Sequence, residues 1–330
     1  MTDAAPGCPV SIVTGFLGSG KTTLIGQVLR DPGFARTAVI VNEFGEIGID
    51  HALIATGSEA VLALTTGCLC CRMQGDLATT LRGLAGQGNY DRVLIETSGL
   101  VDPAPLLASV LIDPEVTAGH RLDCVVTLVD ARAGAATLDR HIEARRQVAV
   151  ADRIVLTKTD LAGPVPALRA RLADVAPVVD AVRGAIDPAV LFGPVDAAAR
   201  AGRLAGLAPD VGPNPFARGR HGAGLGSVVL EHDRPIAGAA LSLFLEALLA
   251  HAGPRLLRLK GLVEIVEAPG RPLLLQAAQH GLAPPEFLDG WPQGWEGGGR
   301  LVLIGQDLPP YFAQRLLAAV EEEVGDAAGG

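Results

Sequence analysis

Aromatic residues are scarce in this 330-residue chain, at 4%, although hydrophobic residues make up 49% of it. We therefore expect an interior built mainly from Ala, Val and Leu. The length favours two domains and allows a sizeable core. Long apolar stretches are also lacking, because the longest beyond the N-terminal region, Ala237 to Ala250, is interrupted by Glu246. This stretch is too short to span a bilayer, so we predict no membrane segment.

Positive charge is in deficit, with 27 Lys and Arg residues against 36 Asp and Glu residues and a formal net charge of −9. The chain has no cationic tract long enough to follow the phosphates of a polymer, which argues against a nucleic-acid partner. The N-terminus, Met1 to Ala5, lacks the positive start of a signal peptide. We expect a cytoplasmic protein whose partner is a small anion or a metal cation.

Cysteine is rare, with five residues in the whole chain, but Cys68, Cys70 and Cys71 crowd together after Gly67. Five are too few for a disulfide scaffold. In a regular strand Cys71 would point away from the other two, so all three reach one ion only if the chain turns, which Gly67 permits. Three thiolates suit Zn²⁺ or Cu⁺. Burial as small core residues and a redox switch are the alternatives.

Short apolar runs alternate with helical segments through the first half of the chain. This alternation predicts an α/β fold with a mostly parallel sheet covered by helices on both faces. The predicted strands are Val10 to Thr14, Thr37 to Val41, Arg92 to Glu96, Cys124 to Val129 and Arg153 to Thr157. The predicted helices are Lys21 to Arg30, Asp76 to Ala85, Ala135 to Val150 and Val165 to Val175.

A Gly, Pro, Ala and Arg-rich stretch then breaks this pattern. We predict a linker at 192–225 between a P-loop domain at 1–191 and a smaller α+β domain at 226–330 with an antiparallel sheet. The strands expected in the second domain are Ser227 to Glu231, Leu256 to Val266, Leu273 to Ala277 and Arg300 to Ile304. Its expected helices are Ala239 to His251 and Pro310 to Val324.

A phosphate-binding motif, G-x-x-x-x-G-K-[ST], occupies Gly15 to Thr22 between a predicted strand and a predicted helix. Its glycines let backbone N–H groups surround phosphates at the start of the helix. Lys21 should reach the β- and γ-phosphates, and Thr22 should offer its hydroxyl to Mg²⁺. The candidate nucleotide-binding residues here are Gly15, Gly18, Ser19, Gly20, Lys21, Thr22 and Thr23.

A Lys-x-Asp sequence at the end of a predicted strand, Lys158 to Asp160, follows Thr157. A carboxylate at this sheet edge can accept hydrogen bonds from guanine N1 and N2, and the Lys stem can lie along the ring. Adenine lacks these donors, so Asp160 favours GTP over ATP. In most GTPases Asn stands where this chain has Thr157.

Another predicted strand ends in Glu96, with Gly99 three residues later. The acid can hold Mg²⁺ while the Gly99 N–H senses the γ-phosphate, and the alternative is a carboxylate that only caps the strand. The polar segment Asn42 to Asp50 is a candidate moving part or a passive loop. Its Glu43 is a further candidate metal donor, as are Glu46 and His51.

Six ordered motifs resemble the CobW-type P-loop GTPases, relatives of the HypB and UreG nickel chaperones for hydrogenase and urease. They are Gly15 to Thr23, Asn42 to Gly45 with Asp50, Gly67 to Cys71, Glu96 to Pro103, Gln147 with Ala151 and Asp152, and Thr157 to Asp160. Arg258 to Gly261 and Arg300 to Gly305 resemble the C-terminal domain of that family. The resemblance implies Mg²⁺-dependent GTP hydrolysis, a Cys-x-Cys-Cys metal site coupled to the nucleotide, and delivery of metal to a client. It also implies that Thr in place of Asn before the Lys-x-Asp sequence, as at Thr157, is usual in this family.

Our first hypothesis is a GTP-dependent metallochaperone for Zn²⁺, or for Co²⁺, that acts on a client metalloprotein. Catalysis is assigned to Lys21, Thr22, Glu96 and Gly99. A metal or redox sensor with incidental GTPase activity is the rival, and Lys158 and Asp160 disfavour a small-molecule kinase. A His-rich stretch found in many family members is missing, which argues against metal storage. The sequence assigns no client to the segment from His280 to Pro292, and it leaves the oligomeric state and the fourth metal ligand open.

Overall fold

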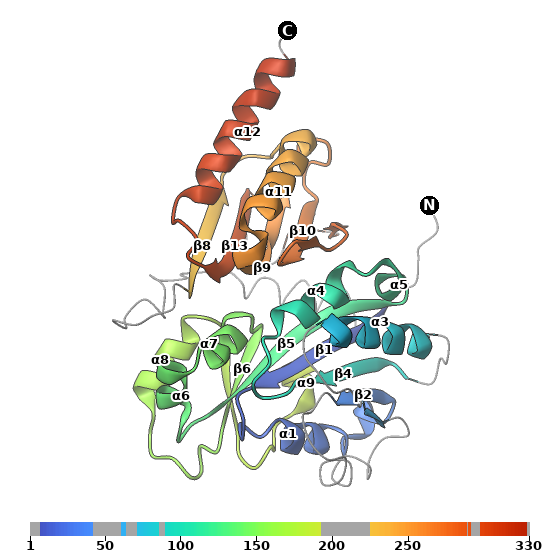
Figure 1. Ribbon diagram of the computed structural model, residues 1–330, viewed down its shortest axis with the longest axis vertical. Coiled ribbons are helices and arrows are strands. Elements are labelled where there is room, and N and C mark those ends of the chain that lie inside the picture. The colour runs from blue at the N-terminus through green and yellow to red at the C-terminus, as the bar shows by residue number, and fades with distance from the viewer. Residues whose placement is uncertain are drawn as a thin grey trace. The chain divides into compact units, whose positions relative to one another are not determined.

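A computed structural model of the chain describes residues 7–41, 61–63, 71–85, 90–192, 225–288, 290–291 and 298–328. The chain divides into two compact units, Met1–Val195 and Asp196–Gly330 (Figure 1). The predicted linker, 192–225, lies outside the described residues except at its two ends.

A fully parallel sheet organises the first unit. Within the described residues it has seven strands in the order β3-β2-β4-β1-β5-β6-β7, and each neighbouring pair is parallel. The strands are β1 (Cys8–Gly15), β2 (Thr37–Val41), β3 (Val61–Ala63), β4 (Arg92–Glu96), β5 (His120–Asp130), β6 (Arg153–Thr157) and β7 (Val178–Ala181). The predicted parallel α/β architecture is confirmed.

Helices cover both faces of this sheet, with α1 on one side and α3, α4 and α5 on the other (Figure 1). They are α1 (Lys21–Val28), α3 (Cys71–Ala85), α4 (Ala104–Ile112), α5 (Pro114–Thr117), α6 (Gly134–Arg140), α7 (Ile142–Ala149), α8 (Pro166–Ala173) and α9 (Pro188–Phe192). Val13 of β1 and Leu94 of β4 pack with Leu24 of α1 in one core cluster. Burying each such side chain contributes about 1.5–3 kcal/mol.

One long helix predicted from Ala135 to Val150 is wrong, because the chain breaks between α6 and α7 at His141. That residue has extended backbone angles, φ −114° and ψ 120°. Its ring lies 4.5 Å, centroid to centroid, from the ring of Phe16. No Gly or Pro marks the break, so a tertiary contact and not local propensity accompanies it.

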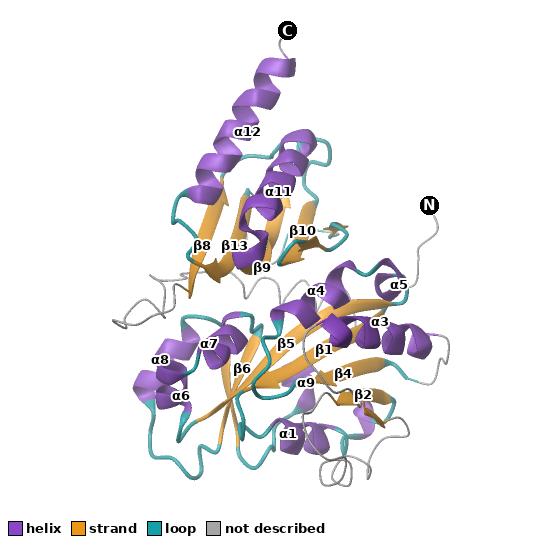
Figure 2. Cartoon of the chain, in the orientation of Figure 1, coloured by secondary structure: helices purple, strands orange, loops and turns teal. Residues whose placement is uncertain are grey.

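An antiparallel sheet organises the second unit, in the order β11-β10-β9-β13-β8 with β12 beside β10. Its strands are β8 (Leu225–His232), β9 (Leu256–Glu264), β10 (Pro272–Ala278), β11 (Gly281–Leu282), β12 (Glu286–Phe287) and β13 (Gly299–Gln306). Figure 2 shows the helices α11 (Gly238–Ala252) and α12 (Phe312–Ala328) of this unit. Their buried side chains share one core with the sheet. The predicted α+β unit is confirmed. Among the described residues, neither unit has a helix long and apolar enough to cross a membrane.

The segment after His280 has a structural role in this unit. Strands β11 and β12 both pair with β10. Leu288 and Trp291, which follow β12, pack against Leu262 and Leu274 in a second, smaller cluster. The segment therefore shields apolar side chains of β9 and β10 that lie outside the core formed with α11 and α12.

A substitution of Phe244 tests how much the main core of the second unit depends on one aromatic ring. It is 0% exposed in the core shared by α11, α12 and the sheet. We expect Phe244→Ala to lower the free energy of unfolding of this unit by about 3–5 kcal/mol, because it leaves a cavity. Both tryptophans, Trp291 and Trp295, belong to this unit. Tryptophan fluorescence during denaturant unfolding of the full chain therefore reports on it.

Leu243 is the matched control for that measurement, because it precedes Phe244 on the same helix and is 46% exposed. Leu243→Ala should change the free energy by no more than about 0.5 kcal/mol. Equal losses in the two variants would contradict the assigned core.

Candidate functional site

The loop between β1 and α1 has the conformation that the phosphate-binding motif predicts. Gly15, Gly18 and Gly20 have φ angles of 144°, 72° and 95°, which L side chains rarely adopt. A Cβ on Gly15 would lie 2.4 Å from the carbonyl oxygen of Leu128 on β5. The residue that precedes α1, Gly20, makes no side-chain capping bond, and the N-terminal end of a helix is a suitable place for an anion.

Three carbonyl groups of this loop accept hydrogen bonds from side chains. Lys21 Nζ donates to Gly15 O at 3.0 Å, Lys158 Nζ to Gly18 O at 2.7 Å, and Thr157 Oγ1 to Ser19 O at 2.8 Å. In a trans peptide each carbonyl and the following N–H point in opposite directions. Lys158 and Thr157 therefore hold the Gly18 and Ser19 carbonyls to one side and turn the next N–H groups to the other. This explains a Thr at position 157, since its hydroxyl anchors the loop.

Thr22 and Glu96 lie together where β1 and β4 end. Thr22 Oγ1 donates to Glu96 Oε1 at 2.8 Å, and Glu96 is 0% exposed. Beside them, Thr97 Oγ1 donates to Thr14 Oγ1 at 2.7 Å, which ties the two strand ends together. Hydroxyl and carboxylate oxygens are hard ligands of the type that Mg²⁺ prefers. The residues present therefore fit a magnesium ion.

The turn that follows β4 packs directly on the phosphate loop. Val101 N donates to Ser98 O at 3.2 Å and closes the turn. A Cβ on Gly99 would lie 2.6 Å from the backbone nitrogen of Leu17. Only glycine allows this approach without a shift of one of the two segments. The structure thus places Gly99 next to the residues that are predicted to hold phosphate.

Two charged residues that the sequence analysis missed lie beside Lys158 and Asp160. Asp130, the last residue of β5, pairs with Lys158 Nζ at 2.7 Å. Burial alone would raise the pKa of the Asp130 carboxyl, but hydrogen bonds from Lys158 and the Arg132 N–H lower it below its usual value. Asp130 follows a buried strand at the same sheet edge, and that position could have identified it.

Arg183 is the second missed residue. Its Nε lies 3.9 Å from Asp160 Oδ2, and its side chain is 88% exposed. Arg183 and Gly184 have φ angles of 52° and 76°, and they form a turn closed by Ala185 N donating to Val182 O at 2.8 Å. This turn follows β7, a strand of four residues that is too short for a periodic signal.

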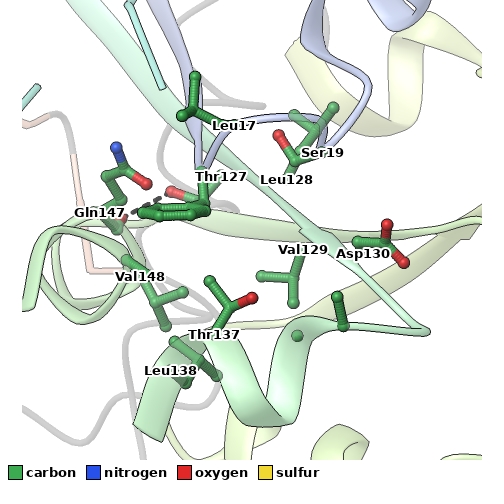
Figure 3. A pocket seen from close by; sticks show the side chains of 14 residues that line it. Leu17, Ser19, Thr127, Leu128, Val129, Asp130, Thr137, Leu138, Gln147 and Val148 are labelled. Atoms are coloured by element: carbon green, nitrogen blue, oxygen red, sulfur yellow. Dashed lines mark hydrogen bonds between the residues drawn. The ribbon is translucent and has the colours of Figure 1, made fainter. Parts of the chain in front are cut away.

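A small cleft of about 40 Å³ lies beside the phosphate loop (Figure 3). Its walls come from the loop, the end of β5, and helices α6 and α7, and its lining includes Leu17, Ser19, Asp130, Thr137 and Gln147. In Figure 3 a hydrogen bond joins Thr127 to Gln147, and Thr127 Oγ1 donates to the Gln147 carbonyl at 2.8 Å. Helix α7 is thereby fixed to the strand next to β1.

The predicted metal ligands fall at the margin of the described residues. Cys71 is the first residue of α3, whereas Cys68, Cys70 and Glu43 lie outside the described residues. Within the described part of the chain, no group of three or more His, Cys, Asp or Glu side chains could hold a metal ion. The thiolate site stays a prediction.

The strands that lead into these segments end next to Glu96. Val41, the last residue of β2, pairs with Glu96 of β4 and with Ala63, the last residue of β3. Val41 and Ala63, the last described residues before Glu43 and Cys68, therefore lie at the edge that carries Glu96.

Comparison with known proteins agrees with this geometry. A model described as the CobW/HypB/UreG nucleotide-binding domain matches residues 9–183, and one described as the cobalamin synthesis protein cobW C-terminal domain matches residues 225–321. The chain belongs to the CobW/HypB/UreG family. The resemblance seen in the sequence is confirmed, and it extends to the second unit.

Two relatives match over almost their whole length. The zinc chaperone YjiA of Escherichia coli (strain K12) is 33% identical over 311 residues, covering 91% of this chain and 94% of YjiA. The zinc chaperone CobW of Sinorhizobium sp. is 32% identical over 340 residues, covering 90% and 92%. The crystal structure of Zn(II)-bound YjiA GTPase from E. coli has a TM-score of 0.67 at 29% identity, covering 96% and 99%.

The approach of Gly99 to the phosphate loop can be tested by adding a methyl group. We expect Gly99→Ala to lower the free energy of unfolding of the first unit by about 1–3 kcal/mol, because the turn must move away from Leu17. Calorimetry of the full chain without nucleotide measures this change, and tryptophan fluorescence shows whether the second unit is unaffected.

Gly83 on α3 supplies the control, since a Cβ there would meet no described atom within 4 Å. Gly83→Ala should raise the free energy of unfolding by about 0.5–1 kcal/mol through helix propensity. A Gly99→Ala variant as stable as the unmodified chain would show that the two segments do not pack closely.

Proposed function

We propose that the protein is a cytoplasmic, GTP-dependent metallochaperone. It binds GTP with Mg²⁺ and hydrolyses it to GDP and phosphate. It carries a transition metal on Cys68, Cys70 and Cys71 and releases it to a client metalloprotein according to the nucleotide bound. The observation that carries the nucleotide part is the Thr22–Glu96 hydrogen bond of 2.8 Å at the start of a glycine-rich loop and helix. The names of YjiA and CobW as zinc chaperones favour Zn²⁺ as cargo over Co²⁺.

The phosphate loop would hold the nucleotide through its backbone. Backbone N–H groups between Gly15 and Thr23 would bond the phosphates, whereas the Ser19 N–H closes the loop by donating to the Phe16 carbonyl at 3.1 Å. Lys21 would exchange the Gly15 carbonyl for β- and γ-phosphate oxygens, which attract its charge more strongly. Lys21 Nζ lies 3.0 Å from Gly15 O, within the phosphate loop itself. A rotation of the Lys21 side chain would therefore bring the ammonium group to the phosphates.

Thr22 and Glu96 would hold Mg²⁺, and the Gly99 N–H would bond the γ-phosphate. When bound, Mg²⁺ supplies positive charge against the β- and γ-phosphate oxygens. Glu96 is buried and already bonded to Thr22, so we assign it to positioning and not to removing a proton from the attacking water. We therefore expect slow hydrolysis.

Guanine would be recognised by Asp160, with Lys158 along the ring and Thr157 bracing the loop. One outcome distinguishes this assignment from general nucleotide binding. Asp160→Asn replaces an acceptor of two N–H bonds by an amide that can donate to the 2-oxo group of xanthine. We expect GTP affinity to fall at least tenfold, by about 1.4 kcal/mol or more, and XTP affinity to rise.

Titration of both nucleotides by calorimetry measures this switch. Asp187→Asn serves as the control, because its carboxylate lies elsewhere and accepts from the Ala189 N–H. Parallel loss of GTP and XTP binding in Asp160→Asn would contradict a base-reading role.

The coupling of metal to nucleotide rests on the strand ends. β2, β3 and β4 finish in register, with Val41 paired to Ala63 and to Glu96. A change at Glu96 and Gly99 on GTP binding would therefore act beside the points where the chain departs toward Glu43 and the cysteines. A tenfold change in metal affinity requires about 1.4 kcal/mol of differential binding, the size of one ordered loop contact.

Metal transfer to an apo acceptor tests the proposal as a whole. We expect Zn²⁺ loaded on the protein to reach the acceptor several-fold faster with GTP than with a non-hydrolysable analogue. Cys70→Ser with Cys71→Ser should lower Zn²⁺ affinity by at least about 100-fold, because two thiolate ligands are lost. A colorimetric zinc chelator measures both quantities.

Two variants control this experiment. Lys21→Ala should make transfer indifferent to the nucleotide while leaving Zn²⁺ binding intact. Cys8→Ser should change neither, because burial raises the pKa of the Cys8 thiol to about 11 and keeps it from acting as a thiolate. Equal transfer with GTP and the analogue would contradict the chaperone proposal and favour the sensor.

A further inference from the structure

We propose that Gln147, on α7, is the positioning residue for recognition of the γ-phosphate. Its buried amide would hold the turn from Ser98 to Val101 in the arrangement that presents the Gly99 N–H. The inference rests on the proposed function, in which Gly99 bonds the γ-phosphate, and it adds a residue that lies 48 positions away from Gly99 in the chain.

The side-chain amide of Gln147 bonds the turn at two points. Nε2 donates to the carbonyl oxygen of Gly99 at 3.1 Å and to that of Val101 at 3.1 Å. Gln147 is 0% exposed. An amide nitrogen carries two hydrogens, so one group can serve both carbonyls. The two bonds, together with the bond from Val101 N to Ser98 O, define the shape of the turn.

Helix α7 is a rigid support for this contact. The backbone carbonyl oxygen of Gln147 accepts a hydrogen bond from Thr127 Oγ1 of β5 at 2.8 Å (Figure 3). The preceding residue, Arg146, forms an ion pair of 2.8 Å with Asp102, just beyond the turn. Asp102 in turn accepts from the Ala104 N–H at 3.0 Å, where α4 begins. The turn is therefore fixed to α7 along its length from Gly99 to Asp102.

The turn also contacts the phosphate loop. Gly99 packs against Leu17, and Figure 3 shows Leu17 and Gln147 lining the same cleft. The turn thus contacts both the loop that would hold phosphate and the helix that carries Gln147. Glycine has the widest backbone freedom of any residue, so its N–H is oriented only as well as its neighbours hold it. Gln147 supplies that restraint through its bonds to the Gly99 and Val101 carbonyls.

A substitution of Gln147 should affect the binding of GTP, which has a γ-phosphate, more than the binding of GDP, which lacks one. Among the nucleotide's phosphates, the γ-phosphate is the one assigned to Gly99, so loosening the turn should weaken GTP more than GDP. We expect Gln147→Leu to lower affinity for a non-hydrolysable GTP analogue about tenfold, the effect of one or two lost hydrogen bonds. GDP affinity should change less than about twofold. A residue that only stabilised the fold would lower both affinities alike.

Gln147→Glu provides a second test that does not depend on the apolar variant folding. The introduced carboxylate would face two carbonyl oxygens in a buried position, which favours its protonated form. The protonated acid can donate one hydrogen bond, whereas the carboxylate can donate none. Affinity of this variant for the GTP analogue should therefore recover as pH falls from about 9 to about 6. The ratio to GDP affinity removes pH effects common to both nucleotides.

Glu143→Gln is the matched control, since it changes charge one turn earlier on α7. Its ratio of the two affinities should equal that of the unmodified protein at every pH. The proposal is overturned if Gln147→Leu and Gln147→Glu lower both affinities equally, or neither, while the unmodified protein prefers the GTP analogue in a Mg²⁺-dependent way. An unmodified protein that binds no guanine nucleotide would instead overturn the proposed function.

Discussion

The phosphate loop keeps its shape because side chains from other parts of the sheet bond its carbonyl groups. Lys158 and Thr157 bond the carbonyls of Gly18 and Ser19 from β6, and β5 approaches so closely that Gly15 leaves no room for a side chain. The loop therefore does not depend on its glycines alone. Glycine permits the conformation, and the neighbouring strands select it. The residues assigned to the base brace the backbone assigned to the phosphates, so the two halves of the nucleotide site form one structure.

A parallel sheet is the reason that distant segments can serve one site. The carboxyl ends of the described strands of the first unit lie at one edge of the sheet. The Thr22–Glu96 pair and the Asp130–Lys158 pair both lie at this edge, although long stretches of chain separate their members. Val41 and Ala63, the last described residues before the predicted metal ligands Glu43 and Cys68, lie at the same edge. The antiparallel second unit has its own core among the described residues.

The sequence predicted those parts of the molecule in which local pattern and function agree. The phosphate loop, Glu96 and the strand before Lys158 carry fixed motifs inside regular elements, and the structure places them at one edge. β3 and β7 were missed because strands of three and four residues have no readable period. α4 was missed because it is apolar on nearly all sides. The contacts of Arg183 and Gln147 depend on tertiary packing, because a single sequence does not state which distant residue each side chain will meet.

The hydrogen bonds from Thr157 and Lys158 to the phosphate loop also determine when the loop can reach its final conformation during synthesis. Thr157 and Lys158 lie 138 and 140 residues after the loop positions that they bond. At roughly 5–20 residues per second, a ribosome needs roughly 7–28 s to make that stretch. During this interval the earliest functional element of the nascent chain lacks the partners that shape it. Nucleotide would therefore bind only after β6 has been made, which makes ligand binding a late step in the synthesis of the chain.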